Sequence, residues 1–331
     1  MKSFLLIISV MLLAVFMVCS QAYASPNPEG TKETIETTPE AQPKAVPKSD
    51  EKEYDWLEVR VSLAWQSDDN VVLLNNNAAL VPDYDANKIV TTVTLRATPI
   101  KTTSWKFGAQ YDFYNAGHSD VDYMEIQTHS LLFFGIYSNS PSYLYFPLST
   151  NLYRLDHSTY LSTLRFAPTY YYEQSNRWLL TLSLSAEILD YRRDADRDYD
   201  GIDYIFSVSE TFLLNRKSWL KATASYNYLK AHADYLSYAG PKFMLSYDTP
   251  IIFDIAATFS ASYHYRDYRE ENPTTLVARL DKRTVFDVYL VRPIKWGISA
   301  FARYTYIENN SDEKNFDYSR NIITLGLEWN Y

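Results

Sequence analysis

Two things are nearly absent from this 331-residue sequence: cysteine and long apolar runs. The one cysteine, Cys19, lies in an N-terminal leader, and cleavage after Ala24 would leave a mature chain without thiols. We therefore expect neither disulfide bonds nor thiol chemistry. Beyond the leader, no stretch reaches the ~18 consecutive apolar residues that a membrane-spanning helix needs, which excludes a helical membrane protein.

Basic residues are also too few to balance the acids. Lys and Arg total 31 against 40 Asp and Glu, which gives a formal net charge of −9. An acidic chain repels a phosphate backbone, so no nucleic-acid partner is expected. Tyrosine is abundant, with 30 residues, yet the mean hydropathy is a mildly polar −0.30. Such an average is typical of strands with one face in lipid and the other in water.

The N-terminal segment has the layout of a secretory signal peptide. An apolar run covers residues 4–18, and Ala22-Tyr23-Ala24 fits the small-x-small cleavage pattern. Residues 1–24 are therefore predicted to be removed on export. A lipoprotein signal at Cys19 is the alternative, but Val18 stands where a small residue is expected before a lipidated cysteine.

The segment that follows, Ser25–Glu53, is rich in Pro, Glu, Lys and Thr and has little apolar surface to bury. This composition predicts a disordered segment, which we place in the periplasm. Two interpretations stay open: a flexible leader with no role of its own, or a tether that meets cell-wall or periplasmic partners.

The last twelve residues alternate between apolar and polar side chains. One face has Ile323, Leu325, Leu327, Trp329 and Tyr331, and the other is mostly polar. A period of two predicts a strand with one apolar and one wet face. An amphipathic strand that ends on an aromatic residue resembles the signal by which the barrel assembly machinery recognises bacterial outer-membrane proteins.

A membrane protein without spanning helices must be a closed β-barrel, because lipid cannot satisfy free backbone groups. We predict an all-β, transmembrane antiparallel barrel over residues 54–331 with about fourteen strands, twelve being the alternative. The segment 251–266 alternates most cleanly, with Ile251, Phe253 and Ile255 opening its apolar face. The predicted strand centres are 56–66, 88–98, 104–115, 122–136, 142–154, 158–173, 178–190, 202–213, 219–231, 235–247, 251–266, 276–291, 295–307 and 318–331.

Connections between these segments alternate between short turns and longer polar loops. Barrels of this kind place short turns in the periplasm and long loops outside. Six of the seven tryptophans fall near the predicted periplasmic turns or chain ends, and only Trp65 falls at the other rim. Tryptophan favours the membrane interface, so these six predict an interface girdle. They are Trp56, Trp105, Trp178, Trp219, Trp296 and Trp329.

The segment 276–331 resembles the C-terminal part of the barrel domain in the surface lipoprotein assembly modifier family. The resemblance rests on R-L-D-K-R at 279–283, Y-I-E-N-N-S at 306–311 and D-Y-S-R-N at 317–321. It implies an outer-membrane barrel of similar size. Members of that family also have a helical-repeat periplasmic domain, for which this sequence shows only the Ser25–Glu53 segment. No catalytic residues are implied.

Charged residues of both signs fall on the predicted inward face of many strands. Because charges at membrane depth are costly unless paired or hydrated, they indicate either a wet pathway with a constriction or an ion-pair network that fills a closed lumen. The best candidates for the constriction lie in the last three strands. They are Arg279, Asp281, Arg283, Asp287, Arg303, Arg320 and Glu328.

Two further patterns point weakly to other chemistry. Asp196, Asp198, Asp200 and Gly201 fit the opening of a calcium loop, although the twelfth position is Ser207, not Glu, and a solvated acidic loop is the plainer interpretation. Ser262 and His264 share a strand face, which is the spacing of an activated nucleophile, but polar lumen lining explains them more simply.

The sequence therefore favours an integral outer-membrane barrel that acts as a channel or as an export or translocation pore. A plugged barrel that acts through its loops and tether is the alternative, and an outer-membrane enzyme is the least supported. The expected partners are outer-membrane lipid, lipopolysaccharide and the assembly machinery. The transported solute or client is not indicated, and no cofactor beyond the calcium candidate is expected.

Overall fold

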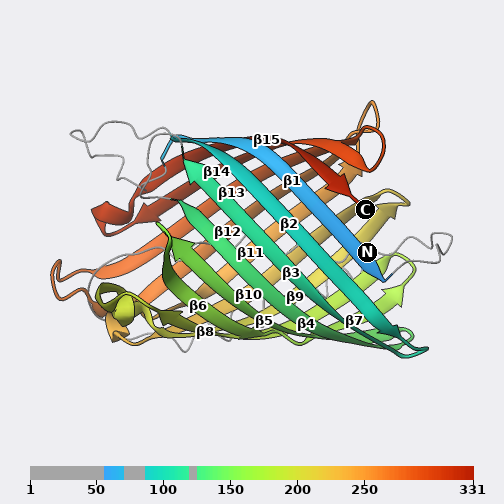
Figure 1. Ribbon diagram of the computed structural model, residues 1–331. Coiled ribbons are helices and arrows are strands. Elements are labelled where there is room, and N and C mark those ends of the chain that lie inside the picture. Colours follow the sequence, from blue (N-terminus) through green and yellow to red (C-terminus); the bar gives the residue numbers. More distant parts are fainter. Residues whose placement is uncertain (1–55, 71–85, 119–124) are drawn as a thin grey trace.

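The computed structural model describes residues 56–70, 86–118 and 125–331. The predicted signal peptide and tether lie outside these residues. The described chain forms one antiparallel sheet that closes on itself (Figure 1). Its strands are β1 (Leu57–Asp68), β2 (Ala86–Lys101), β3 (Trp105–His118), β4 (Ile126–Asn139), β5 (Ser142–Leu155), β6 (Ser158–Phe166), β7 (Thr169–Ser175), β8 (Trp178–Tyr191), β9 (Gly201–Asn215), β10 (Ser218–Ala231), β11 (Tyr238–Pro250), β12 (Ala256–Glu271), β13 (Ala278–Pro293), β14 (Ile298–Ser311) and β15 (Tyr318–Asn330).

The short strands β6 and β7 are two halves of one wall strand, because both pair with β5 on one side and with β8 on the other. The break falls at Ala167-Pro168, where proline has no N–H for the ladder. The flanking groups keep the wall joined: Ala167 donates to the Pro147 carbonyl at 3.3 Å, and Leu184 donates to the Pro168 carbonyl at 3.1 Å. The barrel therefore has fourteen strands, which confirms the predicted fold class and the higher of the two counts.

Closure occurs where the first strand meets the last. β1 pairs antiparallel with β15 from Arg60 opposite Asn330 to Asp68 opposite Ile322. Beyond this ladder, Tyr331 donates to the Val59 carbonyl at 2.9 Å, and Val59 donates back to the Tyr331 carbonyl at 3.1 Å. The sheet therefore has no open edge at this seam, as a membrane-spanning sheet requires.

The predicted strand start at 251 is wrong, and the predicted starts at 235 and 295 are each three residues early. Residues 251–255 form a turn instead of the beginning of the strand predicted at 251–266, and β12 starts at Ala256. Phe253 and Asp254 take left-handed backbone angles, with φ of 57° and 58°, and the Ile251 N–H donates to the Ile255 carbonyl at 2.7 Å to close the turn. Apolar residues in a turn mimic a strand's alternation. Here Ile252 and Phe253 are 67% and 73% exposed at the rim.

The outer wall of the barrel is an apolar belt. Large apolar side chains stand exposed around the whole circumference, among them Leu63 at 58%, Leu184 at 59%, Phe206 at 49%, Phe286 at 51% and Leu327 at 54%. The C-terminal residues predicted as an assembly signal belong to it, since Ile323, Leu325, Leu327, Trp329 and Tyr331 are all exposed. So much contiguous apolar surface requires a lipid environment.

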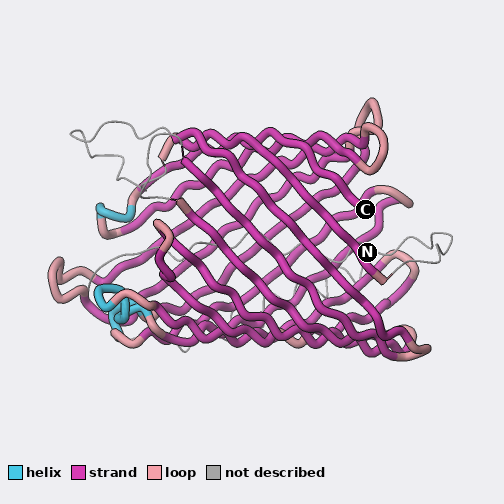
Figure 2. Tube along the Cα trace, in the orientation of Figure 1, coloured by secondary structure: helices cyan, strands magenta, loops and turns pink. Residues whose placement is uncertain are grey.

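The two ends of the barrel differ. One end, which we call the turn rim, has both ends of the barrel chain, and all of its connections between strands are short. At the other end, which we call the loop rim, most of the connections are longer (Figures 1 and 2). The loop rim carries the 3-10 helices η2 (Asp194–Tyr199), η3 (Asp234–Leu236) and η4 (Lys314–Phe316). In the part of the chain described, no helix is long and apolar enough to cross a membrane.

The six girdle tryptophans all lie at the turn rim, either in the first or last residues of a strand or in a turn. Trp296, in the turn before β14, is 86% exposed. Trp219 differs from the others because its register partners, Leu213 and Asp248, place it on the inward face of β10. Trp65 lies towards the loop rim, as the sequence predicts.

The two faces of the wall predict opposite responses to a buried charge. Phe206→Arg places a guanidinium on the lipid side near the middle of β9, and we expect it to lower the free energy of unfolding by about 2–4 kcal/mol. Ser207→Arg, at the next position but facing the lumen, is the matched control and should cost clearly less. Urea unfolding of both variants, refolded into vesicles, measures the difference. Equal losses would contradict the assignment of the two faces.

Candidate functional site in the lumen

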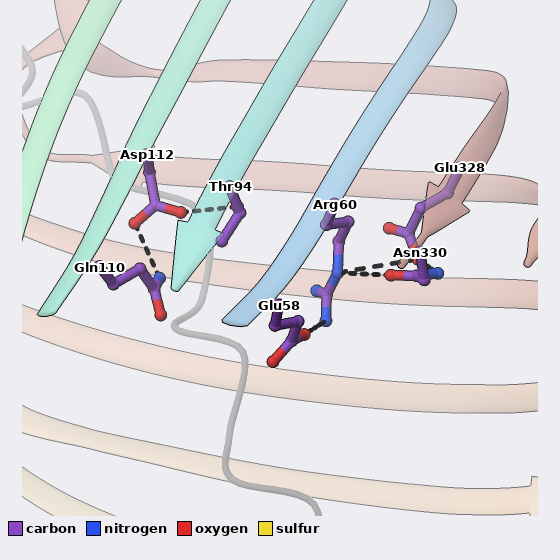
Figure 3. Close-up of polar contacts among 7 residues, drawn as sticks. All are labelled: Glu58, Arg60, Thr94, Gln110, Asp112, Glu328 and Asn330. Carbon is purple, nitrogen blue, oxygen red and sulfur yellow. Dashed lines mark hydrogen bonds and ion pairs between the residues drawn. The ribbon is translucent and has the colours of Figure 1, made fainter. Parts of the chain in front are cut away.

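The lumen wall near the turn rim carries exposed charges, which we call the vestibule (Figure 3). Arg60 on β1 donates to Glu58 at 3.0 Å and to the Asn330 side chain at 3.0 Å, and its Nε lies 4.0 Å from a Glu328 carboxylate oxygen. The side chains of Arg60 and Glu58 are 35% and 45% exposed. These groups therefore join β1 to β15 while their side chains keep partial access to solvent.

Further along the wall, carboxylates of the vestibule are held by neighbouring donors. Asp112 accepts from the Thr94 hydroxyl at 2.6 Å and from the Gln110 amide at 2.8 Å (Figure 3). On the other side of the seam, Asp287 accepts from Arg303 Nε and from the Thr305 hydroxyl, both at 2.6 Å. Acids and bases thus occur together on the lumen wall from β13 to β3, and their side chains keep partial access to solvent.

Towards the loop rim the charges become buried. Asp68, at the end of β1, has no solvent exposure and accepts from Arg320 Nε on β15 at 2.9 Å, while Lys88 Nζ on β2 lies 3.8 Å away. This cluster ties β15, β1 and β2 together at the top of the seam. Two cations around one carboxylate satisfy the buried charge, whereas a single unpaired ion there would be costly.

A second buried ion pair lies on β13. Arg279 makes a bidentate contact with Asp281, at 2.9 Å and 2.6 Å, and Asp281 is fully buried. The guanidinium lies between two rings, 3.6 Å from the Phe316 centroid and 4.5 Å from the Tyr268 centroid. Because Phe316 belongs to η4, this stack fixes a loop-rim helix against the inner wall.

Aromatic and aliphatic residues form a further part of the inward surface at the loop rim, beside buried polar residues such as Arg266 and Asn309, and we call these apolar residues the mouth cluster. It spans β5 to β12 and meets the Arg279 stack through Tyr268. Tyr199 of η2 packs against it, and burial, with the nearby Tyr235, raises the pKa of Tyr199 while the Arg279 guanidinium lowers it in part. The cluster contains Tyr153, Tyr160, Leu161, Leu189, Tyr191, Leu229, Tyr238 and Tyr268.

The seven predicted lumen residues all lie on inward positions, but they do not form one constriction. Asp287, Arg303 and Glu328 belong to the vestibule, whereas Arg279 and Asp281 belong to the stack at the mouth. Arg320 binds Asp68 in the seam cluster. Arg283 is 6% exposed and lies in register with His264 and Asn309. Strand periodicity fixes the face of a residue, but its height along the tilted wall depends on register.

Sequence reasoning missed Asp68, Lys88 and the mouth cluster. Asp68 lies just beyond one predicted strand segment and Lys88 lies at the end of another. Alternation along the strands could therefore predict that both face inward, but not that they pair. The tyrosines gave no local signal, because tyrosine also occurs on the lipid side of this wall, as at Tyr263.

The remaining predictions concern a calcium loop and the inward-facing His264. Among the described residues, no group of three or more His, Cys, Asp or Glu side chains is placed to hold a metal ion. Asp198 accepts from the Tyr235 hydroxyl at 3.2 Å, Asp200 accepts from the Tyr191 N–H at 2.6 Å, and Asp196 is buried, so the three carboxylates serve the η2 fold separately. His264 faces the lumen and accepts from Arg266 Nε at 3.2 Å.

Comparison with known proteins found structural neighbours of low similarity. No family model and no curated protein matches the sequence, so the resemblance of 276–331 to the lipoprotein assembly modifiers gains no support. Among solved structures, an anion-selective porin from Comamonas acidovorans matches with 8% identity and a TM-score of 0.47, over 83% of this chain and 98% of that one. OmpT, an outer membrane protein of Vibrio cholerae, matches with 7% identity and a TM-score of 0.46, over 83% and 99% of the two chains. A Pseudomonas aeruginosa FadL homologue matches with 9% identity and a TM-score of 0.46, over 84% and 90%.

At these levels of similarity, the matches bear on neither substrate nor mechanism. The class follows from the molecule itself. A closed antiparallel sheet with an apolar outer belt and a polar interior is the architecture of bacterial outer-membrane β-barrels, and this chain has that fold.

The seam cluster gives a stability prediction. Arg320→Met keeps the aliphatic stem but leaves buried Asp68 with Lys88 as its cation, and we expect a loss of about 3 kcal/mol in the free energy of unfolding. Arg192→Met is the control, because the Arg192–Asp190 pair is about half exposed (54% and 46%) and should contribute within about 1 kcal/mol. The midpoint of heat-modifiable gel mobility ranks the variants. A similar midpoint for both would refute the role of the seam cluster.

Proposed function

We propose that this protein is an outer-membrane channel with a hydrated, mixed-charge vestibule and a gate at the loop rim. The observation that carries the proposal is the change in burial along the lumen wall. Near the turn rim Glu58 and Arg60 are 45% and 35% exposed, whereas near the loop rim the side chains of Asp68 and Asp281 have no exposure at all.

Charged groups that stay wet at one end support passage, because a barrel that serves only as a rigid anchor gains nothing from them. The packed end supports a gate instead of a permanent plug. The mouth cluster depends on contacts between the wall and the short helices η2 and η4, which belong to connecting segments and not to the sheet. Such contacts can break without breaking the barrel ladder.

The orientation follows the usual arrangement of these barrels, with short turns and chain ends in the periplasm and longer loops outside. In this arrangement the vestibule opens to the periplasm, and the mouth cluster closes the lumen at the cell surface. A permanently plugged barrel that acts through its loops is the second candidate. The same buried clusters favour it if their contacts at the loop rim never break.

Single-channel recording in a planar bilayer tests the gate. The double variant Tyr238→Ala/Tyr268→Ala removes two inward rings that face each other across β11 and β12, with centroids 5.3 Å apart. We expect about five- to tenfold more open time than in the native protein, because the loss of such an aromatic contact costs roughly 1–1.5 kcal/mol. The matched control is Phe243→Ala/Tyr263→Ala, a cross-strand pair on the lipid side of the same strands.

The outcomes separate the two candidates. Frequent openings in the inward variant alone support a gated channel. Equal, steady conductance in all three proteins supports passage but removes the gate. No conductance in any of them, with folding shown by heat-modifiable mobility, supports the permanently plugged barrel and overturns the proposal.

Ion selectivity tests the vestibule separately. In the open variant, Arg60→Glu replaces a positive charge beside Glu58 and Glu328, and we expect the reversal potential in a salt gradient to shift towards cation selectivity. Lys282→Gln changes an exposed charge on the outer face of β13 and should leave the reversal potential unchanged. An equal shift in both variants would mean that the vestibule does not line the pathway.

A further inference from the structure

On β3–β5 the apolar belt is interrupted by a group of polar side chains that face outward. Tyr111 on β3, His129 and Gln127 on β4 and Arg154 on β5 form this lateral patch. Their positions alternate with lumen residues and share parity with exposed Leu131, Phe133, Leu148 and Leu152, which are 38–53% exposed. Polar groups on a lipid-facing wall are costly and therefore need a function.

The patch is internally organised. The Tyr111 hydroxyl and His129 Nδ1 are 2.9 Å apart and hydrogen-bonded, and the Phe113 ring lies 5.2 Å from the imidazole. Gln127 is the direct register partner of Arg154, and its Oε1 accepts from the guanidinium at 3.4 Å. These hydrogen bonds hold the polar side chains against the outer wall. Without them, the side chains would extend towards the aqueous rim.

A depression of about 200 Å³ lies beside the tyrosine–histidine pair. Its outward lining is Tyr111, His129, Leu131, Thr150 and Leu152. Tyr111, Leu131 and Thr150 lie in one row across the strands, and His129 and Leu152 lie in the next row towards the loop rim. Most of the exposed lining is apolar, and the Tyr111 hydroxyl and His129 Nδ1 are already hydrogen-bonded to each other. A depression of this kind on the lipid side therefore holds a segment of an acyl chain better than it holds water.

On β4 the outward positions become more polar towards the loop rim, from Leu131 through His129 to Gln127. On β5, Leu152 lies between Thr150 and Arg154, so that strand adds its charge only at the rim, where Arg154 pairs with Gln127. An amphiphile of the adjoining leaflet runs from acyl chain to ester and hydroxyl groups to headgroup. The β4 side of the patch, with Arg154 beside it, follows that order.

At the loop rim beside the patch, the connection between strands is short and charged residues lie next to it. Only Asp156 and His157 connect β5 to β6, and Arg154 donates to the His157 carbonyl at 2.6 Å. Glu125 lies in the same place, accepting from the Gln127 amide at 3.2 Å and lying 3.4 Å from His157 Nε2. A guanidinium suits a phosphate, while the amide and carboxylate oxygens suit hydroxyl groups.

We propose that the lateral patch is a binding site for one phosphorylated glycolipid of the adjoining leaflet. Its acyl chain occupies the depression, its sugar hydroxyls meet Gln127 and Glu125, and its phosphate meets Arg154. The site lies on the outer face of the wall and does not depend on whether the lumen conducts.

Native mass spectrometry of the full-length protein tests the site. The protein is refolded in detergent with lipopolysaccharide of a deep-rough type, with the same lipid after removal of its phosphates, or with millimolar inorganic phosphate. We expect one retained phosphorylated glycolipid per chain. Arg154→Gln should weaken its retention about tenfold, as expected for one charge-assisted hydrogen bond to phosphate. Lys230→Gln, which removes an exposed outward charge near the loop rim on β10, is the matched control and should change nothing.

A second variant addresses the acyl chain. Leu131→Trp fills the depression without altering the polar groups and should reduce retention of the intact lipid. Retention that is unchanged in both Arg154→Gln and Leu131→Trp would overturn the proposal. So would equal retention of the dephosphorylated lipid, or displacement of the lipid by inorganic phosphate, because the first removes the phosphate contact and the second reduces the site to a simple anion site.

Discussion

Every other feature of this barrel depends on the seam between β1 and β15. An open sheet edge in lipid would leave a row of unsatisfied backbone groups, so the first and last strands must meet in register before the wall is complete. The ladder from Arg60 to Asp68 provides the backbone pairing. Arg60 at the turn rim and Arg320 at the loop rim add side-chain contacts that hold both ends of the seam. Only after this closure do inside and outside exist as separate surfaces.

Closure also decides how charge is distributed. Along one strand the inward positions differ little in sequence, yet those near the turn rim stay hydrated and those near the loop rim are buried under η2 and η4. Asp287 and Asp281 illustrate this, since they lie on the same face of β13, six residues apart. The first retains some exposure beside Arg303, at 12%, and the second has none beside Arg279. The connecting segments, more than the strands, therefore determine how much of the lumen wall is buried.

On the outer wall, the distribution of polar side chains again determines what the surface can bind. Where it is uniformly apolar, it needs no partner beyond the membrane. At the lateral patch of β3–β5, neighbouring strands bring Tyr111 to His129 and Gln127 to Arg154, and along β4 the outward side chains become more polar towards the loop rim. A barrel can in this way carry one function inside its wall and another on its outer face.

The sequence alone determined the class of fold and the face of nearly every strand residue, because a period of two survives without any long-range information and because the lack of apolar runs leaves a barrel as the only spanning structure. It failed locally where a turn imitates a strand, at Ile251 and Phe253. Only the tertiary structure decided which inward residues meet, since the pairing of Asp68 with Arg320 joins the two ends of the chain and the convergence of Tyr268, Arg279 and Phe316 depends on strand register and loop folding. Periodicity is a local property, whereas register around a closed sheet is a global one.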